Sequence, residues 1–85
     1  MMSIIGINER VDSWETATVH LETEGVNPVT VKMLGRDYKY VYTYIKKNSP
    51  VAALTVFQRF RKMDVETILY DLRDMQLVYF AREVK

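Results

Sequence analysis

The amino-acid sequence predicts an α+β domain in which an antiparallel sheet of four to five strands carries two consecutive helices on one face. Apolar and polar residues alternate in the first half of the chain, as they do in half-buried strands. After residue 49, apolar residues recur at helical spacing, and a strand pattern returns near the C-terminus. A sheet backed by helices on one side places both patterns around one core.

Composition supports a single folded domain over residues 1–85. The chain has 12 Lys plus Arg against 11 Asp plus Glu, and 48% of its residues are hydrophobic, which is typical of a globular protein. It contains no Cys, which excludes disulfides and thiol nucleophiles and fits a reducing compartment. The longest apolar stretch, at 50–57, is too short to span a bilayer. We therefore expect a small soluble cytoplasmic domain without membrane contact.

Two strands are predicted before residue 25. The first covers residues 3–9, where three isoleucines make a short apolar segment, and residues 11–14 form a turn. The second covers residues 15–24, where Ala17, Val19 and Leu21 share one face and polar residues occupy the other.

Two further strands are predicted, at 29–33 and at 38–45, and Gly35-Arg36-Asp37 can form the hairpin turn between them. Val29, Val31 and Met33 alternate with polar residues, and nearly every residue from 38 to 45 favours strands. In a strand, four tyrosines would lie on one face. These residues, which we call the tyrosine series, are Tyr38, Tyr40, Tyr42 and Tyr44. In the alternative, a helix, an apolar stripe would form instead from Leu34, Tyr38, Val41, Tyr42 and Ile45.

The C-terminal part predicts helix, helix, strand. Ser49 is suited to cap a helix with Pro50 at its first position, and Asp64 is suited to cap a second helix or a bend. Apolar stripes support both: Ala53, Val56, Phe57 and Phe60 in the first, and Val65, Ile68, Leu69, Leu72 and Met75 in the second. Residues 77–84 then read as a strand with Val78, Phe80 and Val84 on one side.

Chemistry-bearing residues are sparse. His20 is the only histidine, and its spacing from the three serines suggests no catalytic triad. On a strand, His20, Glu22 and Glu24 would share a face, but their separation suits a solvated surface better than a metal site. We therefore predict no enzyme activity, catalytic residue, metal, cofactor or small-molecule substrate.

The tyrosine series is the main candidate for binding. If its rings face the helices, they form much of the core, as large aromatic side chains do in small domains. If they stand on the open face of the sheet instead, they form either a protein interface, where Tyr is enriched, or a stacking surface for single-stranded nucleic acid. Basic residues nearby would complete the surface. The predicted partner-binding residues are Tyr38, Tyr40, Tyr42, Tyr44, Lys46, Lys47, Arg59, Lys62, Tyr70 and Arg73. A net charge of +1 is low for a dedicated nucleic-acid binder.

If residues 35–47 are helical, the C-terminal part resembles a different family. Residues 36–84 would then run helix, helix, helix, strand, and Leu72 with Leu77-Val78 matches a Leu-x-x-x-x-Leu-Val step. This half resembles a winged-helix domain with an N-terminal β extension, and the resemblance implies DNA binding. However, the residues that would face DNA include Glu66, Asp71 and Asp74, and phosphate attraction dominates DNA affinity.

The charge pattern favours a protein partner. Arg59 and Lys62 make the outer face of the first C-terminal helix basic, whereas the outer face of the second is acidic. Opposed patches suit docking to a charged protein or to a second copy of the chain. The sequence therefore predicts a non-enzymatic binding module acting through protein–protein contact, such as a regulator or accessory protein of a larger machine. The alternative is a nucleic-acid binder.

Overall fold

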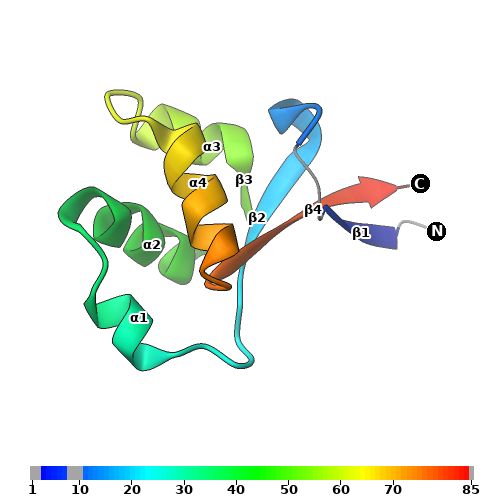
Figure 1. Cartoon of the computed structure of the whole chain (residues 1–85). Helices are drawn as coiled ribbons and strands as arrows, with labels where there is room; N and C mark the ends of the chain where they lie inside the picture. Colours follow the sequence, from blue (N-terminus) through cyan, green and yellow to red (C-terminus); the bar gives the residue numbers. More distant parts are fainter. Residues whose placement is uncertain (1–2, 8–10, 85) are drawn as a thin grey trace.

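The computed structural model describes residues 3–7 and 11–84 of the chain. Its elements, in chain order, are β1 (Ser3–Ile7), the 3-10 helix η1 (Trp14–Thr16), β2 (Ala17–Leu21), α1 (Pro28–Lys32), α2 (Arg36–Asn48), β3 (Val51–Ala52), α3 (Ala53–Arg59), α4 (Val65–Asp74) and β4 (Val78–Val84). Figure 1 shows the four α-helices on one side, from which β1 and β4 extend toward the termini.

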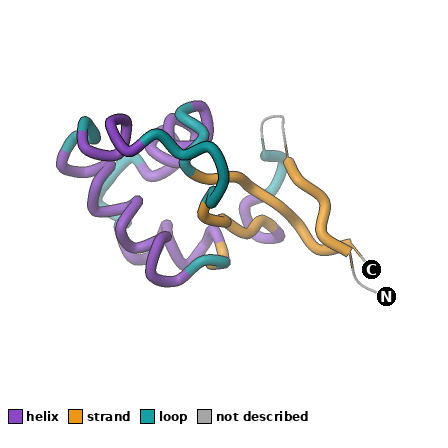
Figure 2. The backbone as a smooth tube through the Cα atoms, turned by 90° about the horizontal axis from the view of Figure 1, so that it is seen from below, coloured by secondary structure: helices purple, strands orange, loops and turns teal. Residues whose placement is uncertain are grey.

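The strands form one antiparallel sheet in the order β1-β4-β2-β3. Three of them have five to seven residues, and β3 adds only a two-residue edge. Strand β4, the last in the sequence, lies between β1 and β2, with Phe80 opposite both Ile7 and Val19. In the view of Figure 2, the strands lead away from the helical part of the molecule.

The core lies between the sheet and the helices. From the sheet, Val19 and Phe80 are fully buried, and from the helices so are Ile45, Leu69 and Leu72. These residues follow the period of two in the strands and of 3.6 in the helices, as a two-layer arrangement requires. Within the described residues, the buried set contains no charged side chain.

The α+β class predicted from the sequence is confirmed. Strands are present at 3–7, 17–21 and 78–84, and Ala17, Val19, Val78 and Phe80 point into the core as predicted. Of the other inward positions, Leu21 is only partly buried and packs against the core, and the side chain of Val84 lies outside the described residues. The helix expected from Ser49 begins only at Ala53, because Val51 and Ala52 pair with β2 and the Ser49 hydroxyl accepts a hydrogen bond from the Leu21 amide.

Two of the predicted strands are wrong. The sheet reaches four strands only through the two-residue edge β3, which was not predicted, so the predicted set of four to five strands does not hold. Residues 28–32 form α1, and residues 36–48 form α2. In α1, the Asn27 side chain caps the helix by accepting a hydrogen bond from the Val29 amide. In α2, the helical alternative prevails because its apolar stripe buries Leu34, Val41 and Ile45. A strand would have placed apolar residues on both of its faces.

Helix α4 is well defined at both ends. The Asp64 side chain accepts a hydrogen bond from the Thr67 amide, as predicted for its cap. At the other end, the Leu77 amide donates to the Leu72 carbonyl and the Gln76 amide to the Arg73 carbonyl, a Schellman motif. Gln76 occupies the left-handed position, with φ 61°, and both leucines are fully buried. The Leu-x-x-x-x-Leu pattern therefore encodes a helix end.

Residues 36–84 have the order predicted by the winged-helix alternative: α2, α3 and α4 are followed by β4. Strand β4, however, pairs with β1 and β2, which precede the helices in the sequence. In this chain, the strands that pair with the one after the last helix therefore come from the N-terminal part. None of the described helices combines the length and the apolar character needed to cross a membrane.

Candidate functional site

The tyrosine series does not share a face, so the predicted one-sided aromatic surface is wrong. Because α2 turns by about 100° per residue, residues two apart point in different directions. Tyr42 is buried, with 7% of its surface exposed. Tyr38 donates a hydrogen bond from its hydroxyl to the Asp71 carboxylate of α4. Tyr40 and Tyr44, by contrast, line a groove at the surface.

Tyr38 is thus part of the contact between α2 and α4. Its hydrogen bond with Asp71 raises the pKa of Tyr38 above its usual value of 10.0, and desolvation adds to this effect. The phenol is therefore protonated near neutral pH and acts as a donor.

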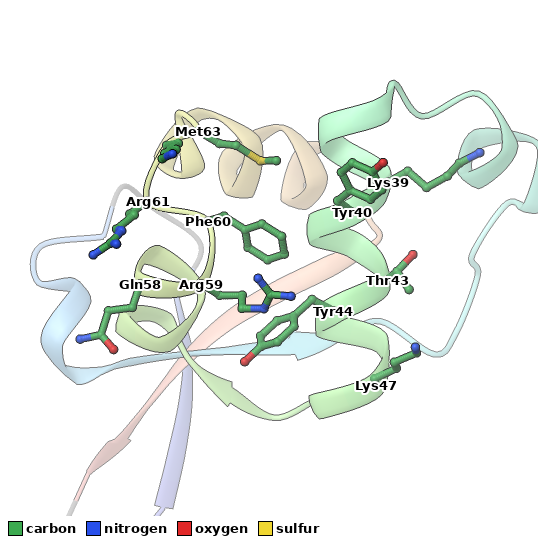
Figure 3. Close-up of a pocket in the computed structure, with 11 residues that line it drawn as sticks. Lys39, Tyr40, Thr43, Tyr44, Lys47, Gln58, Arg59, Phe60, Arg61 and Met63 are labelled. Atoms are coloured by element: carbon green, nitrogen blue, oxygen red, sulfur yellow. The ribbon is translucent and has the colours of Figure 1, made fainter.

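Tyr40 and Tyr44 line a groove with a volume of about 950 Å³. One wall is α2, and the other is formed by the end of α3 and the loop at 60–63. Figure 3 shows the Tyr44 ring and the Phe60 ring lying between the two walls. We call this the basic groove; it is lined by Lys39, Tyr40, Thr43, Tyr44, Lys47, Gln58, Arg59, Phe60, Arg61, Lys62 and Met63.

The floor of the basic groove is apolar and aromatic. Tyr44 and Phe60 meet edge to face, with ring centroids 5.5 Å apart. Tyr40 is 50% exposed, and Met63 is partly buried against the core. Such a floor can bury apolar side chains of a partner, and mixed aromatic and methionine surfaces adapt readily to different shapes.

Five cations and no carboxylate line the basic groove: Lys39, Lys47, Arg59, Arg61 and Lys62. Within residues 3–7 and 11–84, the salt bridge present joins Arg73 to Asp74, and no carboxylate pairs with any of these five. Their positive charge is therefore uncompensated inside the described part of the domain. A groove with walls of one sign of charge attracts ligands of the opposite sign.

Arg59 is held at the centre of the groove by two rings. Its guanidinium carbon lies 5.9 Å from the centroid of Tyr44 and 5.4 Å from that of Phe60. Cation–π contacts of this kind orient the planar guanidinium and leave its N–H groups available for hydrogen bonds. A guanidinium fixed in this way is suited to a carboxylate or a phosphate.

The outer side of α4 has the opposite charge, and its carboxylates make contacts within the domain. Glu66 accepts a hydrogen bond of 2.9 Å from the indole N–H of Trp14, and Asp71 accepts one from Tyr38. Asp74 lies 3.8 Å from the Nε of Arg73. These acidic residues therefore differ from the groove cations in having partners.

Tyr70 and Arg73, both predicted to bind a partner, belong to a cluster around Trp14 and do not line the basic groove. The Tyr70 ring lies 5.4 Å from the Trp14 ring, and its hydroxyl accepts a hydrogen bond from the Val11 amide. The Arg73 guanidinium carbon lies 5.0 Å from the Tyr70 centroid. The structure thus places these two residues away from the residues that line the basic groove.

The residues considered for metal or acid–base chemistry are engaged locally. His20 stacks on Tyr79, with centroids 4.8 Å apart, and its Nε2 lies 2.8 Å from the Thr18 hydroxyl. Partial burial lowers the pKa of His20 below its usual value of 6.5. The Glu22 carboxylate accepts from the amides of Thr23 and Glu24. Among the described residues, no cluster of three or more His, Asp or Glu side chains could hold a metal ion.

Of the ten predicted site residues, five line the basic groove: Tyr40, Tyr44, Lys47, Arg59 and Lys62. Lys46 is exposed on α2 but does not line it. The sequence-based prediction missed six groove residues: Lys39, Thr43, Gln58, Phe60, Arg61 and Met63. A helical reading of α2 would have found the first two, because residues 39, 43 and 47 form one row and residues 40 and 44 the next.

No protein-family model matches this chain, and the searches of curated proteins and of solved structures return no match either. The resemblance to winged-helix domains therefore stays at the level of element order. The function has to be argued from the basic groove itself.

Proposed function

We propose that the protein is a non-enzymatic binding module whose basic groove binds an acidic segment of a partner protein. The observation that carries this proposal is the combination of an apolar aromatic floor with five cations around it, none of which pairs with a carboxylate of the described residues. The floor can take up apolar side chains, and the cations can pair with carboxylates beside them.

A distinct protein fits the groove better than a second copy of the chain. One surface of this domain with complementary charge is the outer side of α4. There, Glu66 and Asp71 are already hydrogen-bonded to Trp14 and Tyr38. Removing them from these contacts would cost free energy, because a donor would lose its acceptor in each case.

A protein segment also fits better than single-stranded nucleic acid, the alternative considered from the sequence. Base stacking needs accessible ring faces in a row. Here Tyr38 and Tyr42 are used inside the fold, Arg36 lies 5.8 Å over the Tyr40 ring, and Arg59 lies over Tyr44. The uncompensated cations would still attract phosphates, so the experiment must separate the two ligand classes.

Site-specific photo-crosslinking tests the proposal. A benzophenone amino acid replaces Thr43, which is exposed and lines the basic groove, and the protein is illuminated in an extract of its source organism. The matched control carries the same group at Lys46, which is exposed on α2 outside the groove. We expect Thr43 to crosslink a protein at a segment rich in Asp or Glu and apolar residues, and Lys46 not to do so.

Charge reversal then tests the cause. The double substitution Arg59→Glu and Arg61→Glu should reduce this crosslink at least about tenfold, which corresponds to about 1.4 kcal/mol. Crosslinks that disappear with nuclease treatment would favour the nucleic-acid alternative. A crosslinked segment without acidic residues, or a crosslink that survives charge reversal, would contradict the proposal.

A further inference from the structure

The walls of the basic groove restrict the conformation of what it can bind. One wall is α2, whose backbone groups are bonded within the helix. In the other wall, the Phe60 amide donates to the Val56 carbonyl and the Met63 amide to the Phe60 carbonyl. No residue of a described strand lines the groove. An extended peptide would therefore find no sheet edge with which to pair its backbone.

A helix has no such need, because it satisfies its own backbone hydrogen bonds and presents only side chains. Recognition of a helix in a groove depends on apolar side chains at helical spacing, and recognition of a strand depends on main-chain pairing. The apolar floor offers the first kind of contact and the walls do not offer the second. This difference favours a helical occupant.

The cations define where the charges of such a helix must lie. Lys39 and Lys47 project from the side of α2 away from Phe60, and Arg61 extends from the opposite wall (Figure 3). Lys39 and Lys47 are eight residues apart on α2, a rise of about 12 Å. A partner helix of about nine residues covers this length. Carboxylates on one border of its apolar stripe would meet Lys39 and Lys47, and a carboxylate on the other border would meet Arg61.

We infer that the segment recognised by the basic groove is a short acidic amphipathic helix, with an apolar stripe on the floor and carboxylates along both edges. This inference rests on the proposed function and adds the conformation and pattern of the ligand. Arg59, fixed between Tyr44 and Phe60, would pair with a carboxylate near the middle of the helix.

Three fluorescent peptides of identical composition test the inference by anisotropy with the intact protein. Each peptide contains one Pro. The first peptide places Leu and Glu at helical spacing with the Pro at one end, and the second places Leu and Glu in strict alternation, as in a strand. The third keeps the helical order of the first but has its Pro at the centre, where it breaks a helix. We expect the first peptide to bind at least tenfold more tightly than the other two and to gain helical circular dichroism when bound.

A charge exchange tests the register. The substitution Lys47→Glu should lower the affinity for the first peptide about tenfold. A version of that peptide with Lys in place of Glu at one end, and at that end only, should bind the variant with the original affinity. Equal or tighter binding of the alternating peptide would overturn the helical inference and leave the acidic-segment proposal standing. Binding of none of the three peptides would overturn the helical inference, whereas the proposed function would still be decided by the crosslinked segment.

Discussion

Charged residues on the outer side of α4 and in the basic groove differ in what they contact. On α4, Glu66 and Asp71 accept hydrogen bonds from Trp14 and Tyr38, which come from other elements. In the groove, Lys39, Lys47 and Arg61 are exposed and have no carboxylate partner among the described residues. The polar contacts on α4 stabilise the folded state. The groove cations repel one another, which slightly raises the free energy of the folded state. This difference is what the proposed function requires, because the α4 carboxylates hold the fold together and the groove cations are left to meet a partner's charges.

The largest expected effect is on the α4 side. Trp14→Ala removes a ring that packs against Phe57, Tyr70 and Phe80, together with the donor to Glu66. We expect the free energy of unfolding to fall by about 3 kcal/mol, as for other truncations of packed aromatic residues. Urea denaturation followed by circular dichroism measures it. Tyr40→Ala in the groove is the control and should cost less than about 1 kcal/mol; equal losses would contradict the comparison.

A pair of conservative substitutions gives the next effect. Tyr38→Phe leaves Asp71 without its donor and should lower the free energy of unfolding by about 1–2 kcal/mol. Tyr40→Phe should change it by less than about 0.5 kcal/mol. Each variant lacks one hydroxyl oxygen relative to the wild type. A similar effect in both would therefore show that the hydrogen bond to α4 contributes no stability of its own.

The same hydroxyl predicts a dependence on pH. The folded state raises the pKa of Tyr38, so its contribution to stability is present below pH 10 and is lost as pH rises through the folded pKa. The wild type should therefore lose stability more steeply above pH 10 than Tyr38→Phe does. Parallel slopes in urea titrations from pH 9 to pH 11 would contradict the assignment.

A smaller effect, with opposite sign, is expected at the end of α4. Gln76 has a φ of 61°, a conformation that glycine adopts without steric cost. Gln76→Gly should raise the free energy of unfolding by about 0.5–1 kcal/mol. Thermal denaturation provides the measurement, and Met75→Gly, at the preceding residue with φ −78°, should be destabilising. A loss of stability in Gln76→Gly would mean that the Gln side chain has a structural role.

The smallest effect should come from the groove cations. Lys39→Gln combined with Lys47→Gln removes two charges that have no described partner, so stability should stay within about 0.5 kcal/mol of the wild type or rise slightly. Added salt should reduce any gain in the free energy of unfolding of the variant over the wild type, because salt screens the repulsion between the lysines in the wild type. A loss above 1 kcal/mol would indicate that the lysines have a partner within the domain.

Sequence patterns predicted the parts of the fold that depend on local residue order. Asp64 caps α4 as expected, and the alternation of Ala17 with Val19 identified β2. The error at residues 36–48 arose because Tyr, Val and Ile favour strands when considered singly. The burial of Leu34, Val41 and Ile45 around one helical face outweighed that preference.

The candidate site was predictable only in part. Tyr40, Tyr44 and Lys47 come together by the period of α2, which the sequence contains. Arg61 and Met63 reach the groove because the chain turns between α3 and α4, where the Met63 amide bonds to the Phe60 carbonyl. The turn at 60–63 contains neither Gly nor Pro, so the sequence carries no turn signal there.

The position of β4 between β1 and β2 has a consequence for synthesis of the protein. Strand β4 leaves the ribosome after β1, β2 and all the described helices, yet it joins the two earlier strands. The nascent chain can form its helices as they emerge, but β1 and β2 have no shared neighbour until β4 is released. We therefore expect the sheet to close only after β4 has been released, in one step that joins β1 and β2 through β4.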